Sequence, residues 1–93
     1  MSWSVKAKGT KEEVKAKLTE QFDAAEHLYS GQPEADDVRA VKERALALVD
    51  ACTLEPQYGQ DWNGVSVEAN GSHANGNGFA GGSFQLSVFR VVL

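Results

Sequence analysis

The sequence predicts an α+β fold of two layers, in which a three-stranded, mainly antiparallel sheet packs on an antiparallel helix pair in the order β-α-α-β-β. Apolar and polar residues alternate near both ends of the chain, as in strands with one buried face. Two stretches between them repeat apolar residues at helical spacing, and turn-forming segments separate the elements. Because 93 residues suffice for one modest core, residues 1–93 are expected to form a single domain.

A first strand is expected over residues 3–9, where apolar residues alternate with serine and lysine up to Gly9. The segment from Thr10 to Glu13 then has the form of a capping box, so a helix should begin there. The apolar stripe expected on this helix comprises Val14, Leu18, Phe22, Ala25 and Leu28.

The turn between the two helices is expected at residues 30–33, because Gly31 suits a left-handed helix end and Pro33 cannot continue a helix. A second helix should open either at Pro33 or at the pair Asp36 and Asp37. Its expected stripe is Val38, Val41, Ala45, Leu48, Val49 and Cys52, with Leu46 beside it. The short connection predicts antiparallel neighbours that cover one face of the sheet.

Two further strands are expected over residues 65–70 and 83–88, joined as a hairpin by a long loop at residues 71–82. The second strand should run opposite to the first, and either the second or the third can occupy the middle of the sheet. Residues 4–9 and 66–71 share Ser, Val, Ala and Gly at equivalent positions. These two strands could therefore lie side by side in one sheet.

The last residues of the chain add apolar side chains to the outer face of the third strand. From Trp62 onward only Glu68 and Arg90 carry a charge, so this region is either core or a surface that meets another molecule. We expect a second copy of the chain to cover it, which makes the protein a homo-oligomer. The candidate interface residues are Gln85, Ser87, Phe89, Val91 and Leu93.

Composition limits the classes of partner. A net charge of −4 and a pI of about 5.0 argue against nucleic acid, which requires an excess of cations. The chain has no run of 18 apolar residues and no signal-peptide pattern, so no membrane association is expected. The single cysteine, Cys52, excludes an internal disulfide and is expected to be part of the core; it fits a reducing compartment, for which the cytoplasm is the default.

The glycine-rich loop is the one segment with a motif related to ligand binding. Residues 76–81 match G-x-G-x-x-G, but a strand follows them where a dinucleotide site needs a helix. The loop amides could still bind a small anionic ligand, and the alternative is a plain hairpin tip. The candidate ligand-binding residues are His73, Asn75, Gly76, Asn77 and Gly78.

No pattern in the sequence brings a nucleophile and an acid or base together, so a non-enzymatic protein without a cofactor is expected. The two histidines lack the spacing of a metal site. His27 follows Asp23 by one helical turn, which permits an exposed hydrogen bond between them.

The opening residues 1–5, the lysine-rich capped helix after them and the strand at residues 65–72 resemble a group of small uncharacterised proteins of tailed bacteriophages. The resemblance implies an accessory protein in the bacterial cytoplasm that acts in the virion or on a host system. It brings no catalytic residues with it.

Two function hypotheses follow. The first is a non-enzymatic, self-associating interaction protein, with a host protein as a further possible partner. The alternative is a protein that binds or sequesters a small nucleotide-like ligand through the loop at residues 71–82.

Overall fold

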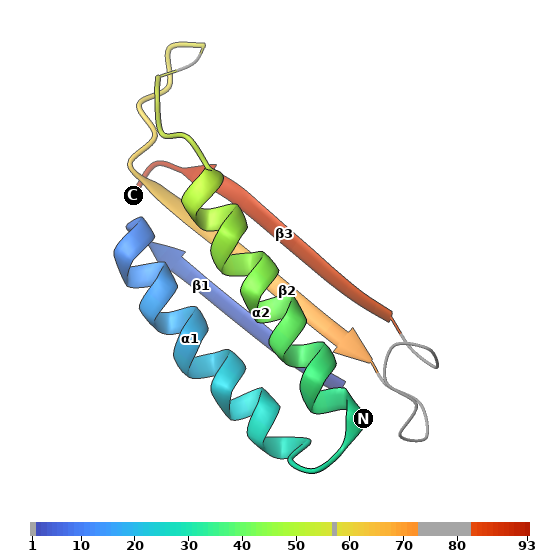
Figure 1. Ribbon diagram of the computed structural model, residues 1–93. Coiled ribbons are helices and arrows are strands. Elements are labelled where there is room, and N and C mark those ends of the chain that lie inside the picture. Colours follow the sequence, from blue (N-terminus) through green and yellow to red (C-terminus); the bar gives the residue numbers. More distant parts are fainter. Residues whose placement is uncertain (1, 57, 73–82) are drawn as a thin grey trace.

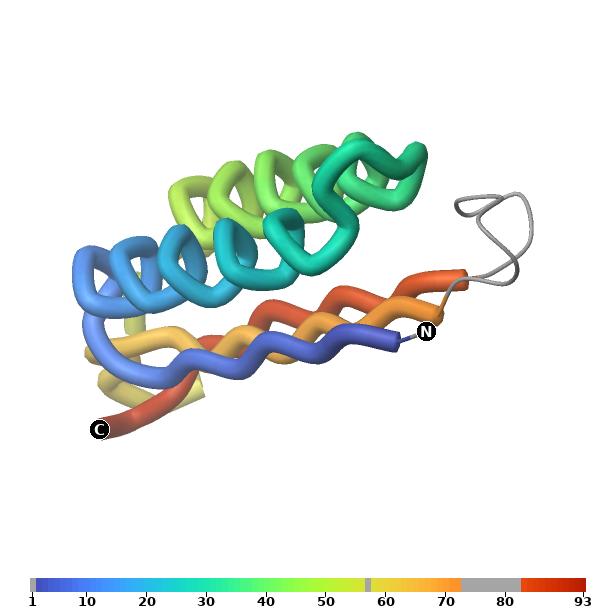
Figure 2. Tube along the Cα trace, turned by 90° about the horizontal axis from the view of Figure 1, so that it is seen from below, coloured from blue at the N-terminus to red at the C-terminus, as the bar shows by residue number. Residues whose placement is uncertain are grey.

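The computed structural model describes residues 2–56, 58–72 and 83–93, and it confirms the predicted fold class. The elements in chain order are strand β1 (Ser2–Gly9), helix α1 (Lys11–Leu28), helix α2 (Pro33–Ala51), strand β2 (Gly64–Ser72) and strand β3 (Ser83–Val91) (Figure 1). Figure 2 shows the two layers, with both helices on one face of the sheet. The opposite face of the sheet carries no other element of the described chain.

The three strands lie in the order β1-β2-β3 and both neighbouring pairs are antiparallel. This order resolves the choice that the sequence left open, because β2 occupies the middle. The similar segments of β1 and β2 lie side by side, which is one of the arrangements that the sequence allowed. Their register pairs Val5 with Ala69 and Ala7 with Val67, so each small residue faces a larger one.

The hydrophobic core lies between the sheet and the helices, and β1 and β2 supply its fully buried strand residues. Trp3 is only 5% exposed and its ring meets Phe22 of α1 edge-on, with the ring centroids 5.6 Å apart. Strand β3 is covered less well. Its Leu86 and Val88 are half-buried, and Phe84 on the same face is 42% exposed.

Both helices begin where the sequence indicates. The hydroxyl oxygen of Thr10 accepts a hydrogen bond from the amide of Glu13 at 3.2 Å, and the hydroxyl donates to the Glu13 carboxylate at 3.0 Å. Helix α2 begins at Pro33 rather than at the later aspartate pair. Proline suits this first position because a helix leaves its first amides without partners inside the helix.

The stripe predicted on α1 is correct at four of its positions and wrong at Leu28, which is 63% exposed. Tyr29 is buried in its place, because it lies four residues after Ala25 and therefore on the same side of the helix. Leu48 of α2 is a second correction. Ala45 and Val49 face the core there, one turn apart, and Leu48 falls at the exposed flank.

Cys52 is half-buried and packs against the core at the carboxyl end of α2, and Leu46 packs there as well.

The predicted loop begins too early, because Gly71 and Ser72 belong to β2. Gly71 lies opposite Trp3, and a Cβ atom at this position would be 2.6 Å from the indole ring. Glycine is therefore required here by the tryptophan that lies against it and not by a turn. Strand β3 also extends beyond its predicted end at residue 88, since Val91 pairs with Gly64.

Candidate interaction surface

The outer face of the sheet, which the helices leave open, consists mainly of small polar side chains. Each row across the sheet takes one residue from every strand, and the middle row contains Lys6, Glu68 and Ser87. Lys6 Nζ lies 3.2 Å from Glu68 Oε1, so the charges of this row are paired. The next row toward the amino end of β1 contains Ser4, Asn70 and Gln85, which are uncharged. This part of the face can approach another surface without isolating a charge.

Apolar residues interrupt this polar face at the carboxyl end of β3. Phe89 lies beside Ser66 and Val91 beside Gly64, which places both side chains on the outer face with Gln85 and Ser87, as predicted. Phe89 is 56% exposed and Leu93 is 54% exposed. We call Phe89, Val91 and Leu93 the C-terminal patch.

The position of Leu93 is fixed by the residues that precede β2. The amide of Leu93 donates to Asn63 Oδ1 at 2.6 Å, and the amide of Asn63 donates to the carbonyl of Val91 at 3.1 Å. The Leu93 side chain lies against Gly64, where a Cβ atom would be 2.7 Å from Leu93 Cγ. These contacts hold the last residue over the sheet beside Val91, so the C-terminal patch is contiguous.

Arg90 lies on the helix side of β3, next to Val65 in the register. Its guanidinium carbon is 5.2 Å from the centre of the Trp62 ring, which is a cation–π distance. Sequence reasoning did not find this contact, because the two residues come from separate segments that only the fold brings together. Arg90 is therefore not available to the outer face.

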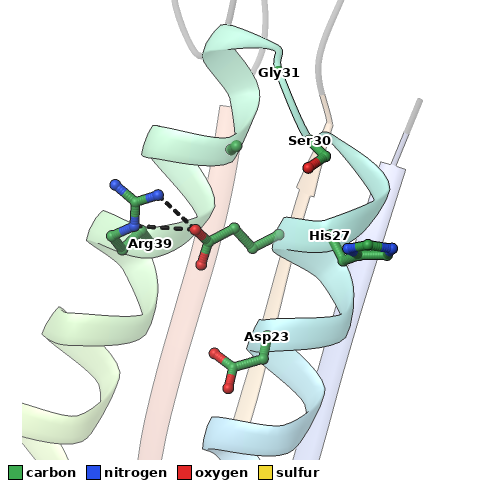
Figure 3. A pocket seen from close by; sticks show the side chains of 7 residues that line it. Asp23, His27, Ser30, Gly31 and Arg39 are labelled. Atoms are coloured by element: carbon green, nitrogen blue, oxygen red, sulfur yellow. Dashed lines mark hydrogen bonds and ion pairs between the residues drawn. The ribbon is translucent and has the colours of Figure 1, made fainter.

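A polar hollow lies between the two helices near their turn (Figure 3). Arg39 of α2 donates to Glu26 Oε1 of α1 at 2.6 and 3.1 Å and also contacts Asp36. These carboxylates raise the pKa of Arg39, and the main cause is the hydrogen bond that Arg39 donates to Glu26. His27 points away from Arg39 in Figure 3. The groups that meet in this hollow bind the helices to one another.

Asp23 does not form the hydrogen bond with His27 that their spacing permits. Asp23 Oδ1 accepts from Lys42 Nζ of α2 at 2.8 Å, which adds a second ion pair between the helices. Among the described residues, no group of three or more His, Cys, Asp or Glu side chains is placed to hold a metal ion. Neither described helix is long and apolar enough to cross a membrane.

Two buried polar residues at the helix turn were not identified from the sequence. Glu34, in the first turn of α2, is buried, and so is Tyr29 at the end of α1. Burial raises the pKa of the Tyr29 hydroxyl, and the negative charge of Glu34 raises it further. The sequence could have indicated Glu34 through its position in the first turn of the second helix, where the helix dipole favours a carboxylate.

The candidate ligand-binding residues His73, Asn75, Gly76, Asn77 and Gly78 lie outside the described residues. Ligand binding by this loop stays a prediction. The interface candidates on β3, which are Gln85, Ser87, Phe89 and Val91, share the outer face of the sheet. Their role as an interface stays a prediction.

No protein-family model, curated protein or solved structure matches the chain.

Proposed function

We propose that this chain is a non-enzymatic interaction protein that associates with a second copy of itself through the outer side of β3. The observation that carries the proposal is the C-terminal patch, in which Phe89 and Leu93 are more than half exposed on a face that otherwise lacks apolar groups. Burying a large apolar side chain contributes about 1.5–3 kcal/mol. A second chain that covers these residues would therefore gain a substantial part of its binding free energy from them.

The polar part of the same face supports this proposal. Gln85 and Ser87 are short, uncharged side chains, and the neighbouring charges of Lys6 and Glu68 are paired with each other. Covering neutral or paired groups requires less desolvation than covering isolated charges. The face therefore combines an apolar contact with a low desolvation cost around Gln85 and Ser87, while the exposed Lys8, in the row of Ser66 and Phe89, lies beside the patch.

The double variant Phe89→Ser with Leu93→Ser tests the proposal. We expect light scattering after size exclusion to give an oligomer for the natural sequence at tens of micromolar and a monomer for the variant. Tyr58→Ser is the matched control, because Tyr58 is an exposed aromatic residue in the loop before β2. A natural sequence that remains monomeric at this concentration contradicts the proposal.

The resemblance to small proteins of tailed bacteriophages extends the proposal to its setting. On that basis the protein is an accessory protein of the bacterial cytoplasm, acting on a host or virion partner. This extension is tested by capturing partners from host lysate with the full chain and with the Phe89→Ser, Leu93→Ser variant. Loss of a specific partner in the variant supports it, and the absence of any specific partner contradicts it.

A further inference from the structure

The two edges of the sheet differ in how their backbone groups are satisfied. At the β1 edge, the Gln21 side chain of α1 accepts from the Lys6 amide at 2.9 Å and donates to the Lys6 carbonyl at 2.8 Å. Lys17 Nζ donates to the carbonyl of Lys8 at 3.2 Å. Side chains of α1 therefore occupy the positions that an added strand would need. Such protection is a common way to prevent unwanted pairing at an edge.

The antiparallel ladder shows which groups of β3 face the opposite edge. The Lys6 backbone groups point away from β2, so those of its neighbour Glu68 point toward β3 and pair with Ser87. Backbone direction alternates along a strand, so Leu86 and Val88 direct their amides and carbonyls to the free edge. Within the described chain, neither residue has a hydrogen-bond partner at that edge.

The helix layer leaves space beside this edge. In Figure 1, β3 runs alongside α2 and is not hidden by it. A hollow of about 300 Å³ separates Phe84 from the flank of α2, where Val41 and Arg44 line it. The exposed backbone groups and the incompletely covered apolar side chains thus lie along the same strand.

We propose that β3 pairs antiparallel with β3 of a second copy, around a two-fold axis at Ser87. The inference rests on the proposed self-association and specifies its geometry. Ser87 is the middle residue of Ser83–Val91, so this axis pairs Leu86 of each chain with Val88 of the other, the two residues whose backbone groups face the free edge. The product is a six-stranded sheet with four helices on one face, because each chain supplies three strands and two helices.

The sequence of β3 is compatible with itself in this register. Leu86 lies opposite Val88 of the second copy, so apolar residues of the two chains meet on the helix side of the sheet. Arg90, the only charged residue of β3, lies opposite Phe84 of the second copy. A parallel arrangement in register would instead place the two Arg90 side chains next to each other, which is unfavourable. Antiparallel pairing therefore suits both the apolar pattern and the charge.

The same register connects this edge with the C-terminal patch. On the outer face, Phe89 lies opposite Gln85 of the second copy, and Val91 lies opposite Ser83 of the second copy. Directly opposed residues have Cβ atoms about 5 Å apart, close enough for the Phe89 ring to pack on its neighbour. Edge pairing would thus cover part of the apolar surface that motivates the proposed function.

Val88→Pro tests the edge directly. Proline removes the amide that faces the free edge and leaves the hydrogen bonds to β2 in place, which edge strands tolerate. We expect sedimentation equilibrium to give a dissociation constant raised about tenfold or more, since the two-fold axis removes two hydrogen bonds at once. Ser4→Pro is the matched control, because the Ser4 amide faces the opposite edge; its dissociation constant should equal that of the natural sequence.

A cross-linking experiment gives a second measurement that does not depend on proline. In a Cys52→Ser background, Ser87→Cys should form an intermolecular disulfide on mild oxidation, because residues at the axis face each other at about 4.5 Å between Cα atoms. Ser66→Cys, on the same face but in the middle strand, should not cross-link. Circular dichroism of each variant checks that the fold is retained.

The outcomes separate this inference from the proposed function. A natural sequence that stays monomeric, or that binds only a different protein at this edge, overturns both. Self-association that survives Val88→Pro, without a Ser87→Cys cross-link, overturns the edge pairing alone. If that association is then abolished by Phe89→Ser with Leu93→Ser, the contact is between outer faces and the proposed function stands.

Discussion

At the scale of single residues, the buried Tyr29 hydroxyl gives the protein a defined response to alkaline pH. Burial, together with the charge of Glu34, raises the pKa of this hydroxyl above its ordinary value of about 10. The folded state therefore holds the proton more tightly than the unfolded state. The resulting stabilisation is complete below pH 10 and is lost as the pH rises through the higher pKa of the folded state.

Replacing this tyrosine by phenylalanine should weaken the alkaline response. In the natural sequence, the free energy of unfolding is expected to fall more steeply above pH 10 than in Tyr29→Phe, which has no hydroxyl to ionise. Urea denaturation at a series of pH values measures both curves. Tyr58→Phe is the control, because it removes the hydroxyl of an exposed tyrosine outside the core. Equal slopes for Tyr29→Phe and the natural sequence would show that this hydroxyl does not control alkaline stability.

At the scale of elements, the contact between α1 and the edge of β1 depends on one amide side chain. Gln21 both donates to and accepts from the Lys6 backbone, so it needs its oxygen and its nitrogen. A glutamate of the same shape retains the acceptor but directs a charged oxygen at the Lys6 carbonyl. The geometry of this edge therefore distinguishes an amide from a carboxylate.

We expect Gln21→Glu to lower the free energy of unfolding at pH 7 by about 0.5–1.5 kcal/mol, the usual contribution of one hydrogen bond. The loss should decrease near pH 4, where a protonated carboxyl can donate again. Urea denaturation at the two pH values measures this change. Gln60→Glu, at an exposed position in the loop before β2, is the control. A loss that is the same at both pH values would argue against the donor role of Gln21.

The elements that depend on local sequence were predictable. Alternating residues, the capping box at Thr10 and the turn at Gly31 act within a few positions, and the structure places strands and helices accordingly. Features that depend on a distant neighbour were not predictable. Glycine is needed at residue 71 because the Trp3 ring leaves no room for a Cβ atom there. The middle place of β2 depends on strand pairing between distant parts of the chain.

The candidate surface was predictable only in part, for the same reason. Alternation along β3 correctly placed Phe89 and Val91 on the outer face. The free edge at Leu86 and Val88 could not be found that way, because it results from the strand order, which places β3 at the edge, and from the position of α2, which leaves that edge uncovered. The protection of the opposite edge by Gln21 also requires the fold, since 15 residues separate Gln21 from Lys6.

At the scale of the whole molecule, most of the charged residues lie on the helix layer, whereas an apolar patch interrupts the outer face of the sheet at β3. Ion pairs join α1 to α2, among them Lys15 with Asp50, Arg39 with Glu26, and Lys42 with Asp23. Exposed pairs of this kind contribute little each, about 0–1 kcal/mol. The sheet instead presents neutral and apolar groups at β3. Strand β3 therefore offers a neutral and apolar surface for contact with another chain.

Association through β3 predicts that stability depends on protein concentration. If the folded chains are paired and the unfolded chains are not, mass action favours the folded state as the concentration rises. A hundredfold increase should then raise Tm by roughly 5 °C for a domain of this size. Differential scanning calorimetry over that range measures the shift. In Val88→Pro the shift should be much smaller, and a Tm of the natural sequence that does not change with concentration would identify the folded state as a monomer.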